Sequence, residues 1–139
     1  MFKNILVPTD LTEKSLVALD IALKINTESD LKITLLHVIE TLEEAEDEDF
    51  REFYEKLEKR AWKKLDEMAQ RYGKEGLKIH REIVFGNRAQ EIVTFAREKE
   101  IDLIVLNSHK IAEVDAAKGW ATISYKVGIL SHCPVMMVK

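Results

Sequence analysis

The segment 101–122 carries the polar residue types that best suit ligand binding. Its apolar run Ile101-Asp-Leu-Ile-Val-Leu106 ends abruptly in Asn107, Ser108, His109 and Lys110. A run this short predicts a buried strand that stops at the edge of a sheet. The residues after it then stand outside the carboxyl ends of the strands, where open α/β sheets bind ligands. Hydroxyl groups of Ser108 and Thr122 can donate to a phosphate, and the Lys110 ammonium can pair with one.

Strand and helix patterns alternate around this segment. Apolar, β-branched runs predict strands at 5–7, 31–39, 78–85, 101–106 and 134–138. Helical spacing predicts helices at 12–25, from the end of the acidic stretch 41–49 to Tyr72, after Asn87, and after Thr122. This alternation predicts an α/β fold in three layers, α/β/α, with five parallel strands and four helices. No linker or repeat divides the chain, so we expect one domain, 1–139.

Several residues have the chemistry of helix ends and turns. Asn87 and Gln90 form a capping-box pattern, Thr122 is a predicted N-cap, and Gly73 and Gly76 are expected to end the long helix. Asp10 has a local alternative to ligand binding, because Asp often caps the turn before a helix. In the long helix we expect Phe50, Phe53, Tyr54 and Leu57 to face the core and a dimer surface rather than a cofactor.

Bulk properties exclude several classes of function. The 139 residues carry 25 acidic and 21 basic side chains, a net charge of −4, which gives no electrostatic case for nucleic acid or membrane binding. We see no signal peptide and no membrane-spanning run. The single cysteine, Cys133, forms no internal disulfide, which indicates a cytoplasmic protein. We expect Cys133 to be a buried, unreactive thiol.

The common catalytic and phosphate-binding motifs are absent. The sequence has neither G-x-G-x-x-G after its first strand, nor a Walker A loop, nor a G-x-S-x-G elbow. Its four histidines lack zinc-ligand spacing, so no metal site is predicted. His37 lies inside a predicted strand, where we expect a structural, hydrogen-bonded histidine.

Four segments, taken together and in order, resemble the universal stress protein family. They are Lys3-Asn-Ile-Leu-Val-Pro-Thr-Asp10, Leu35-Leu-His-Val38, Asp102-Leu-Ile-Val-Leu-Asn-Ser-His109, and Ser124-Tyr-Lys-Val127 with Cys133-Pro-Val-Met-Met-Val138. The resemblance covers nearly the whole chain. It implies a sheet of the adenine-nucleotide α-hydrolase-like type, which we expect in the order 3-2-1-4-5, and a homodimer formed through the last strand.

The resemblance also implies an ATP site with altered chemistry. ATP-binding members carry G-x2-G-x9-G-[ST] after the fourth strand, and the corresponding residues here are Asn107, Lys110, Ala121 and Thr122, with a spacing one residue longer. The three missing glycines weaken a phosphate-binding nest of backbone N–H groups. Lys110 either obstructs the phosphate or pairs with it.

The other parts of the implied pocket match. The family places Pro8, Thr9 and Asp10 against adenine and ribose, and Asp10 can accept a hydrogen bond from either. Val38 corresponds to a position whose backbone meets adenine, although strand packing explains a valine there equally well. His109 has a counterpart near the phosphates, with an exposed loop histidine as the alternative.

Three functions fit these residues to different degrees. The first is a dimeric stress-response regulatory module that binds an adenine nucleotide, ATP with or without Mg²⁺. The second is the same dimer without nucleotide, acting on an unknown protein partner, with Trp120 as a contact residue. The third, an adenylating enzyme of the same superfamily, lacks its serine- and glycine-rich loop, since Pro8-Thr-Asp-Leu-Thr12 stands there. No general base is evident, so any ATP hydrolysis should be slow.

Overall fold

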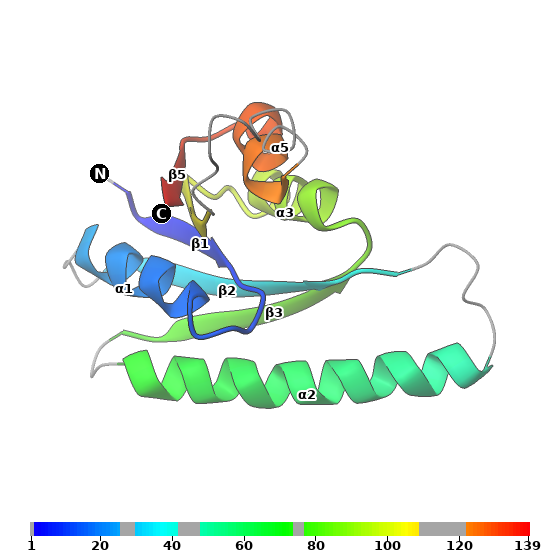
Figure 1. Ribbon diagram of the computed structural model, residues 1–139. Coiled ribbons are helices and arrows are strands. Elements are labelled where there is room, and N and C mark those ends of the chain that lie inside the picture. Colours follow the sequence, from blue (N-terminus) through cyan, green and yellow to red (C-terminus); the bar gives the residue numbers. More distant parts are fainter. Residues whose placement is uncertain (1, 26–29, 42–47, 74–76, 109–121) are drawn as a thin grey trace.

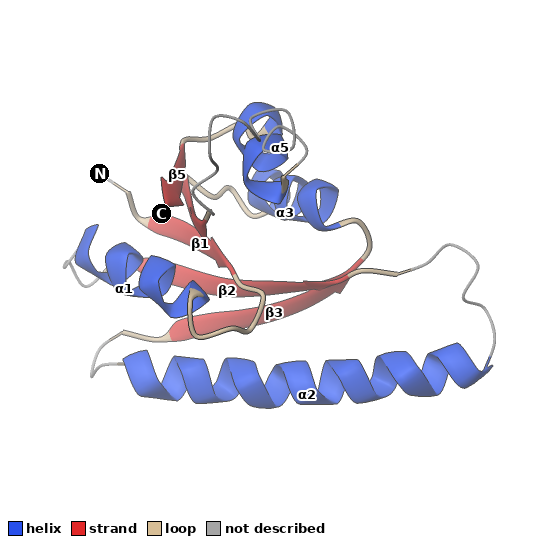
Figure 2. Cartoon of the chain, in the orientation of Figure 1, coloured by secondary structure: helices blue, strands red, loops and turns tan. Residues whose placement is uncertain are grey.

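A parallel sheet between two layers of helices forms the body of the protein (Figure 1). The computed structural model describes residues 2–25, 30–41, 48–73, 77–108 and 122–139. Helices α1 and α2 cover one face of the sheet, and α3 and α5 cover the other (Figure 2). The predicted three-layer α/β/α architecture is therefore confirmed.

The elements follow one another as the sequence pattern predicts. Their bounds are β1 Asn4–Pro8, α1 Ser15–Ile25, β2 Lys32–Ile39, α2 Glu48–Tyr72, β3 Ile79–Phe85, α3 Arg88–Glu98, β4 Leu103–Asn107, α5 Ile123–Leu130 and β5 Val135–Val138. Among the described residues this gives five strands and four helices, as expected.

The sheet has the order β3-β2-β1-β4-β5, which confirms the expected order. All four pairings are parallel, and β1 runs through the centre. The chain places β2 and β3 on one side of β1, and then β4 and β5 on the other side. The direction of winding therefore reverses between β1 and β4. In open α/β sheets this is the point where a crevice forms at the carboxyl ends of the strands.

Alternate residues of the central strands pack into two separate hydrophobic cores, one on each face of the sheet. Ile5 and Val7 of β1 and Val105 of β4 pack with α1 and α2. Leu6 and Ile104 point to the opposite face and pack with α3 and α5. Because both faces are covered, these strands read as continuous apolar runs.

Side-chain caps fix several helix ends as predicted. Asn87 Oδ1 accepts from Gln90 N at 3.1 Å, and Thr122 Oγ1 accepts from Tyr125 N at 3.3 Å. Gly73 N donates to Ala69 O at the end of α2, whereas Gly76 lies outside the described residues. The first helix begins at Ser15, three residues after the predicted start, because 11–14 form turns.

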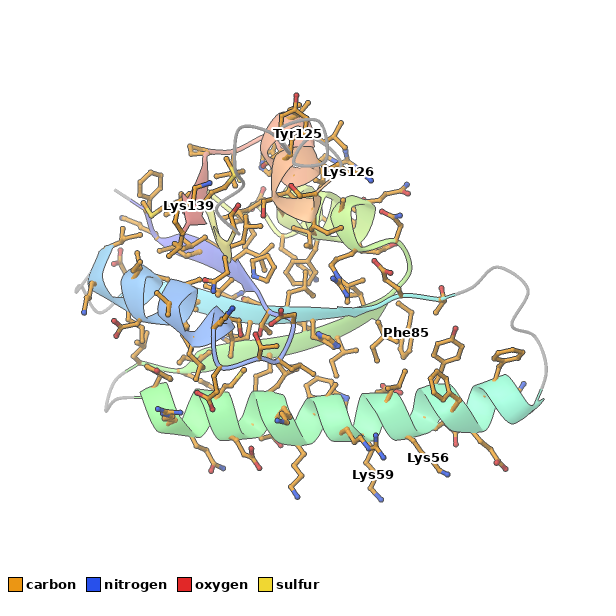
Figure 3. The ribbon with its side chains drawn as sticks, viewed as in Figure 1. Lys56, Lys59, Phe85, Tyr125, Lys126 and Lys139 are labelled. Atoms are coloured by element: carbon orange, nitrogen blue, oxygen red, sulfur yellow. The ribbon has the colours of Figure 1, made fainter. Side chains whose placement is uncertain are left out.

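Two predictions about buried side chains were wrong. Helix α2 has 25 residues and a length of about 37 Å, whereas the seven residues of β3 span about 23 Å. The start of α2 therefore extends beyond the sheet, which leaves Phe50 and Phe53 exposed rather than in the core (Figure 1). Their expected place on a dimer surface stays a prediction. Phe85 lies beside this part of α2, while Lys56 and Lys59 point away from the sheet (Figure 3).

Cys133 is half-buried, not fully buried, because it lies at the rim of the core under α5.

Matched valine substitutions should test this assignment of the core. Val105 is 0% exposed and Val17, on α1, is 49% exposed. Val105→Ala should cost about 2 kcal/mol of unfolding free energy, because two buried methyl groups are lost and a cavity is left. Val17→Ala should be neutral or slightly stabilising, since alanine favours a helix. Urea denaturation of both variants measures this; equal effects would contradict the assignment.

Candidate functional site

A cleft of about 190 Å³ opens at the carboxyl ends of β1, β2 and β4. Backbone pairing explains its position. Strand β1 pairs with β2 as far as Pro8, but it pairs with β4 only at Ile5↔Leu103 and Leu6↔Ile104. Beyond Leu6 the two central strands separate, and the cleft lies in the space between them. Its lining residues are Pro8, Thr9, Asp10, Ser15, Leu36, Val38, Arg88, Ile92, Leu106, Asn107, Thr122, Ile123 and Ser124.

One wall of the cleft is a hydrogen-bonded turn after β1. Leu11 N donates to Thr9 Oγ1 at 3.0 Å, and the Oγ atoms of Thr9 and Ser15 are 2.6 Å apart. Ser15 Oγ donates to Thr12 O at 2.7 Å, so its proton is already used and Thr9 is the donor to Ser15. This chain of bonds fixes the turn, in which Leu11 adopts a positive φ of 70°.

Asp10 caps the turn and also faces the cleft. Its Oδ1 accepts from Thr12 N at 3.0 Å and from Thr12 Oγ1 at 2.5 Å, so the local role of Asp10 is real. Burial raises the pKa of Asp10, but the hydrogen bonds from Thr12 and the charge of Arg88 outweigh this and lower it below the ordinary value. Asp10 is therefore a carboxylate at neutral pH and can accept hydrogen bonds from a ligand.

His37 supports this wall from inside the sheet, as predicted for a structural histidine. Its Nδ1 lies 2.9 Å from Thr9 O. Because a carbonyl only accepts, the neutral ring must carry its proton on Nδ1. Burial lowers the pKa of His37, and the charge of Arg88 lowers it further, against the raising effects of the Thr9 hydrogen bond and Asp10.

The opposite wall is formed by the end of β4 and the start of α5. The Asn107 amide Nδ2 donates to Lys14 O, and Ser124 Oγ donates to Asn107 O at 3.3 Å. Asn107 Oδ1 is buried and has no hydrogen-bond partner among the described residues. This oxygen has almost no exposed surface, so Asn107 lines the cleft through its other atoms. Thr122 places the N-terminus of α5 at the cleft, where backbone N–H groups favour an anion.

Arg88 supplies the remaining charge in the cleft wall, and sequence reasoning missed it. Gly86, with φ of 146°, turns the chain after β3, and its N–H donates to Ile39 O at 3.0 Å. L side chains rarely adopt this positive φ, so the turn favours glycine. The cap at Asn87 then makes Arg88 the first residue of α3. Its position after this predicted cap was the signal that could have identified it.

The structure brings six of the ten predicted site residues together: Pro8, Thr9, Asp10, Val38, Asn107 and Thr122. Ser108 does not line the cleft, and its N–H donates to Val138 O at 2.7 Å. His109, Lys110 and Ala121 lie outside the described residues, as does Trp120. Sequence reasoning missed seven lining residues: Ser15, Leu36, Arg88, Ile92, Leu106, Ile123 and Ser124.

The described residues offer neither a metal site nor a membrane-spanning helix. They contain no group of three His, Cys, Asp or Glu side chains that could hold a metal ion. Within the same ranges, no helix has the length and apolar character required to cross a membrane.

Comparison with known proteins gives one consistent family. The model of the "Universal stress protein family" matches residues 1–139. Universal stress protein MJ0531 of Methanocaldococcus jannaschii is 31% identical, over 100% of this chain and 83% of its own length. The solved structure of MJ0577, from the same organism, has a TM-score of 0.83 at 29% identity and covers 100% of this chain and 96% of the other.

A more distant structure extends the likeness in fold. A universal stress protein family protein from Arabidopsis thaliana, solved with AMP bound, has a TM-score of 0.69 at 21% identity. The match covers 99% of this chain and 91% of the plant protein.

The burial of His37 should make stability depend on pH. The folded-state pKa of His37 is below 6.5, so between that value and pH 6.5 the unfolded chain binds a proton that the folded chain does not. Stability is therefore full above pH 6.5, falls as pH drops from 6.5 toward the folded-state pKa, and levels off below that pKa. In urea denaturation between pH 7.5 and 5.5, His37→Asn should lose less stability than the wild type. Exposed His132→Asn is the control, and equal slopes for all three proteins would contradict the assignment.

Proposed function

Because this chain belongs to the universal stress protein family, we propose that it is a stress-response regulatory protein that binds an adenine nucleotide. The observation that carries the proposal is the cleft where β1 and β4 separate, which is lined by six of the ten predicted site residues at the carboxyl edge of the sheet. The AMP-bound relative from Arabidopsis thaliana supports the same ligand class. The protein has no dedicated catalytic role in this proposal.

The cleft residues fit the parts of a nucleoside phosphate. Leu36, Val38 and Ile92 give the cleft an apolar wall suited to a base. The Asp10 carboxylate suits a ribose hydroxyl. Thr122 and the start of α5 suit a phosphate. ATP is the larger ligand to test, with Mg²⁺ held chiefly by phosphate oxygens and water, as is usual for this ion.

The second function keeps the fold and omits the nucleotide. It is favoured by Asn107, Lys110 and Ala121, which stand where the family's ATP-binding members have glycine. The protein would then act as a dimeric interaction module toward an unknown partner.

We also place the protein in the cytoplasm, because its single cysteine cannot form an internal disulfide.

Nucleotide binding can be tested directly. Mass spectrometry of the supernatant after denaturation should detect AMP, ADP or ATP, and calorimetry should show binding of AMP, and of ATP with Mg²⁺, to the emptied protein. Asp10→Asn should weaken the binding of adenosine, which lacks a phosphate, about tenfold, because a hydrogen bond to a charged group is lost while Oδ1 can still cap the turn. Asp20→Asn, on α1, is the matched control. No binding at about 1 mM nucleotide would favour the second function.

The homodimer is a separate part of the proposal and rests on β5. This edge strand pairs with β4 through inward-facing groups, such as Pro134 O with Ile104 N at 3.0 Å. Val138 O likewise accepts from Ser108 N, so alternation directs the N–H of Met137 outward. Large apolar side chains around the strand are exposed, namely Ile129, Leu130, Met136 and Met137. An open edge beside exposed apolar groups suits pairing with a second copy.

Light scattering should give a mass near twice 16.0 kDa. Met137→Pro should yield a monomer, because it removes an outward N–H and leaves the pairing with β4 intact. Met137→Val keeps that N–H and should remain dimeric. A wild-type monomer, or a dimer that Met137→Pro leaves intact, would contradict the proposed interface.

A further inference from the structure

The charges of the cleft suggest how it distinguishes its ligands. Among the described lining residues, Asp10 and Arg88 are the two that carry a full charge at neutral pH. They are near enough for Arg88 to lower the pKa of Asp10, yet no salt bridge joins them. The formal charge of these walls is therefore zero, and it becomes −1 if Arg88 is neutralised. A cleft with charge −1 would repel a phosphate.

The Arg88 side chain is held at the cleft, but its hydrogen-bond donors are not all used. The cap at Asn87 and the bond from Gly86 N to Ile39 O fix its backbone beside the end of β2. Its one ion pair in the described part of the chain joins Nε to Glu40 Oε1 at 3.8 Å, longer than a hydrogen bond. The side chains of Arg88 and Glu40 are 40% and 56% exposed, so this pair is weak. A guanidinium has five N–H donors, which leaves donors for a ligand.

Arg88 also lies within reach of the phosphate-binding side of the cleft. Helices α3 and α5 pack against each other on one face of the sheet, and both begin at its carboxyl edge (Figure 1). Axes of packed helices are about 8–10 Å apart. Arg88, at the start of α3, and Thr122, at the start of α5, both line the same cleft. A phosphate at α5 therefore lies close enough to feel the charge of Arg88.

We propose that Arg88 makes the cleft selective for nucleotides over nucleosides, by opposing the charge of Asp10 and attracting the phosphate nearest the ribose. This inference rests on the proposed nucleotide function and deepens it. It assigns to Arg88, on α3, a role in binding phosphate beside that of Thr122 and the start of α5. The selectivity is electrostatic, so it weakens as salt rises.

The test compares AMP with adenosine by calorimetry at low salt. The ratio of their affinities cancels contacts to the base and ribose. Arg88→Gln should lower the AMP:adenosine ratio about tenfold, and Arg88→Lys should keep most of it, because the charge remains. Asp10→Asn in the Arg88→Gln background should restore much of the ratio. Arg97→Gln, an exposed site on the same helix, is the control, and all variants should melt at similar temperatures because the Glu40 pair is weak.

Each outcome decides the inference. An AMP:adenosine ratio that Arg88→Gln leaves unchanged overturns it, and so does an equal loss for Arg88→Lys and Arg88→Gln. In both cases the wild type still binds AMP, so the proposed function stands. A wild-type protein that binds neither AMP nor adenosine overturns the proposed function and this inference together.

Discussion

The short pairing between β1 and β4 is the constraint on which the rest of the site depends. These central strands share only Ile5↔Leu103 and Leu6↔Ile104, whereas β1 continues beside β2 as far as Pro8. Because winding reverses at this point, α1 leaves to one face and α5 follows β4 on the other. The crevice is therefore a consequence of strand order, and the side chains at its edges only determine what it binds.

The opposite end of the same strand pair is held together firmly. Asp102 accepts from Lys3 N at 2.8 Å and from Asn4 N at 3.2 Å, and its own N–H donates to Asn4 O at 2.9 Å. The Asn4 amide adds bonds to Lys99 O and Glu100 O. These contacts join the start of β1 to the turn before β4. The two strands are thus fixed at their amino ends and free to separate at their carboxyl ends, where the ligand site lies.

The sequence could predict the elements and half of the site because both depend on local patterns. Apolar runs such as Ile5–Val7 mark strands, and polar residues after such runs must reach the carboxyl edge. Arg88, Ser15 and Ser124 enter the cleft from helix starts, and their proximity depends on how α1, α3 and α5 pack on the sheet. Likewise, helical periodicity cannot show that α2 is longer than β3, which is why Phe50 and Phe53 were wrongly assigned to the core.

The proposed nucleotide site lies where β1 and β4 separate, at the carboxyl edge of the sheet. Mapping of backbone amide chemical shifts by two-dimensional NMR during titration with AMP tests it most directly. The largest changes should fall at Thr9, Asp10, Val38, Arg88 and Thr122, with little change at the amino edge around Lys32 and His80. Largest changes at that amino edge, or no changes with AMP at about 1 mM, would contradict it.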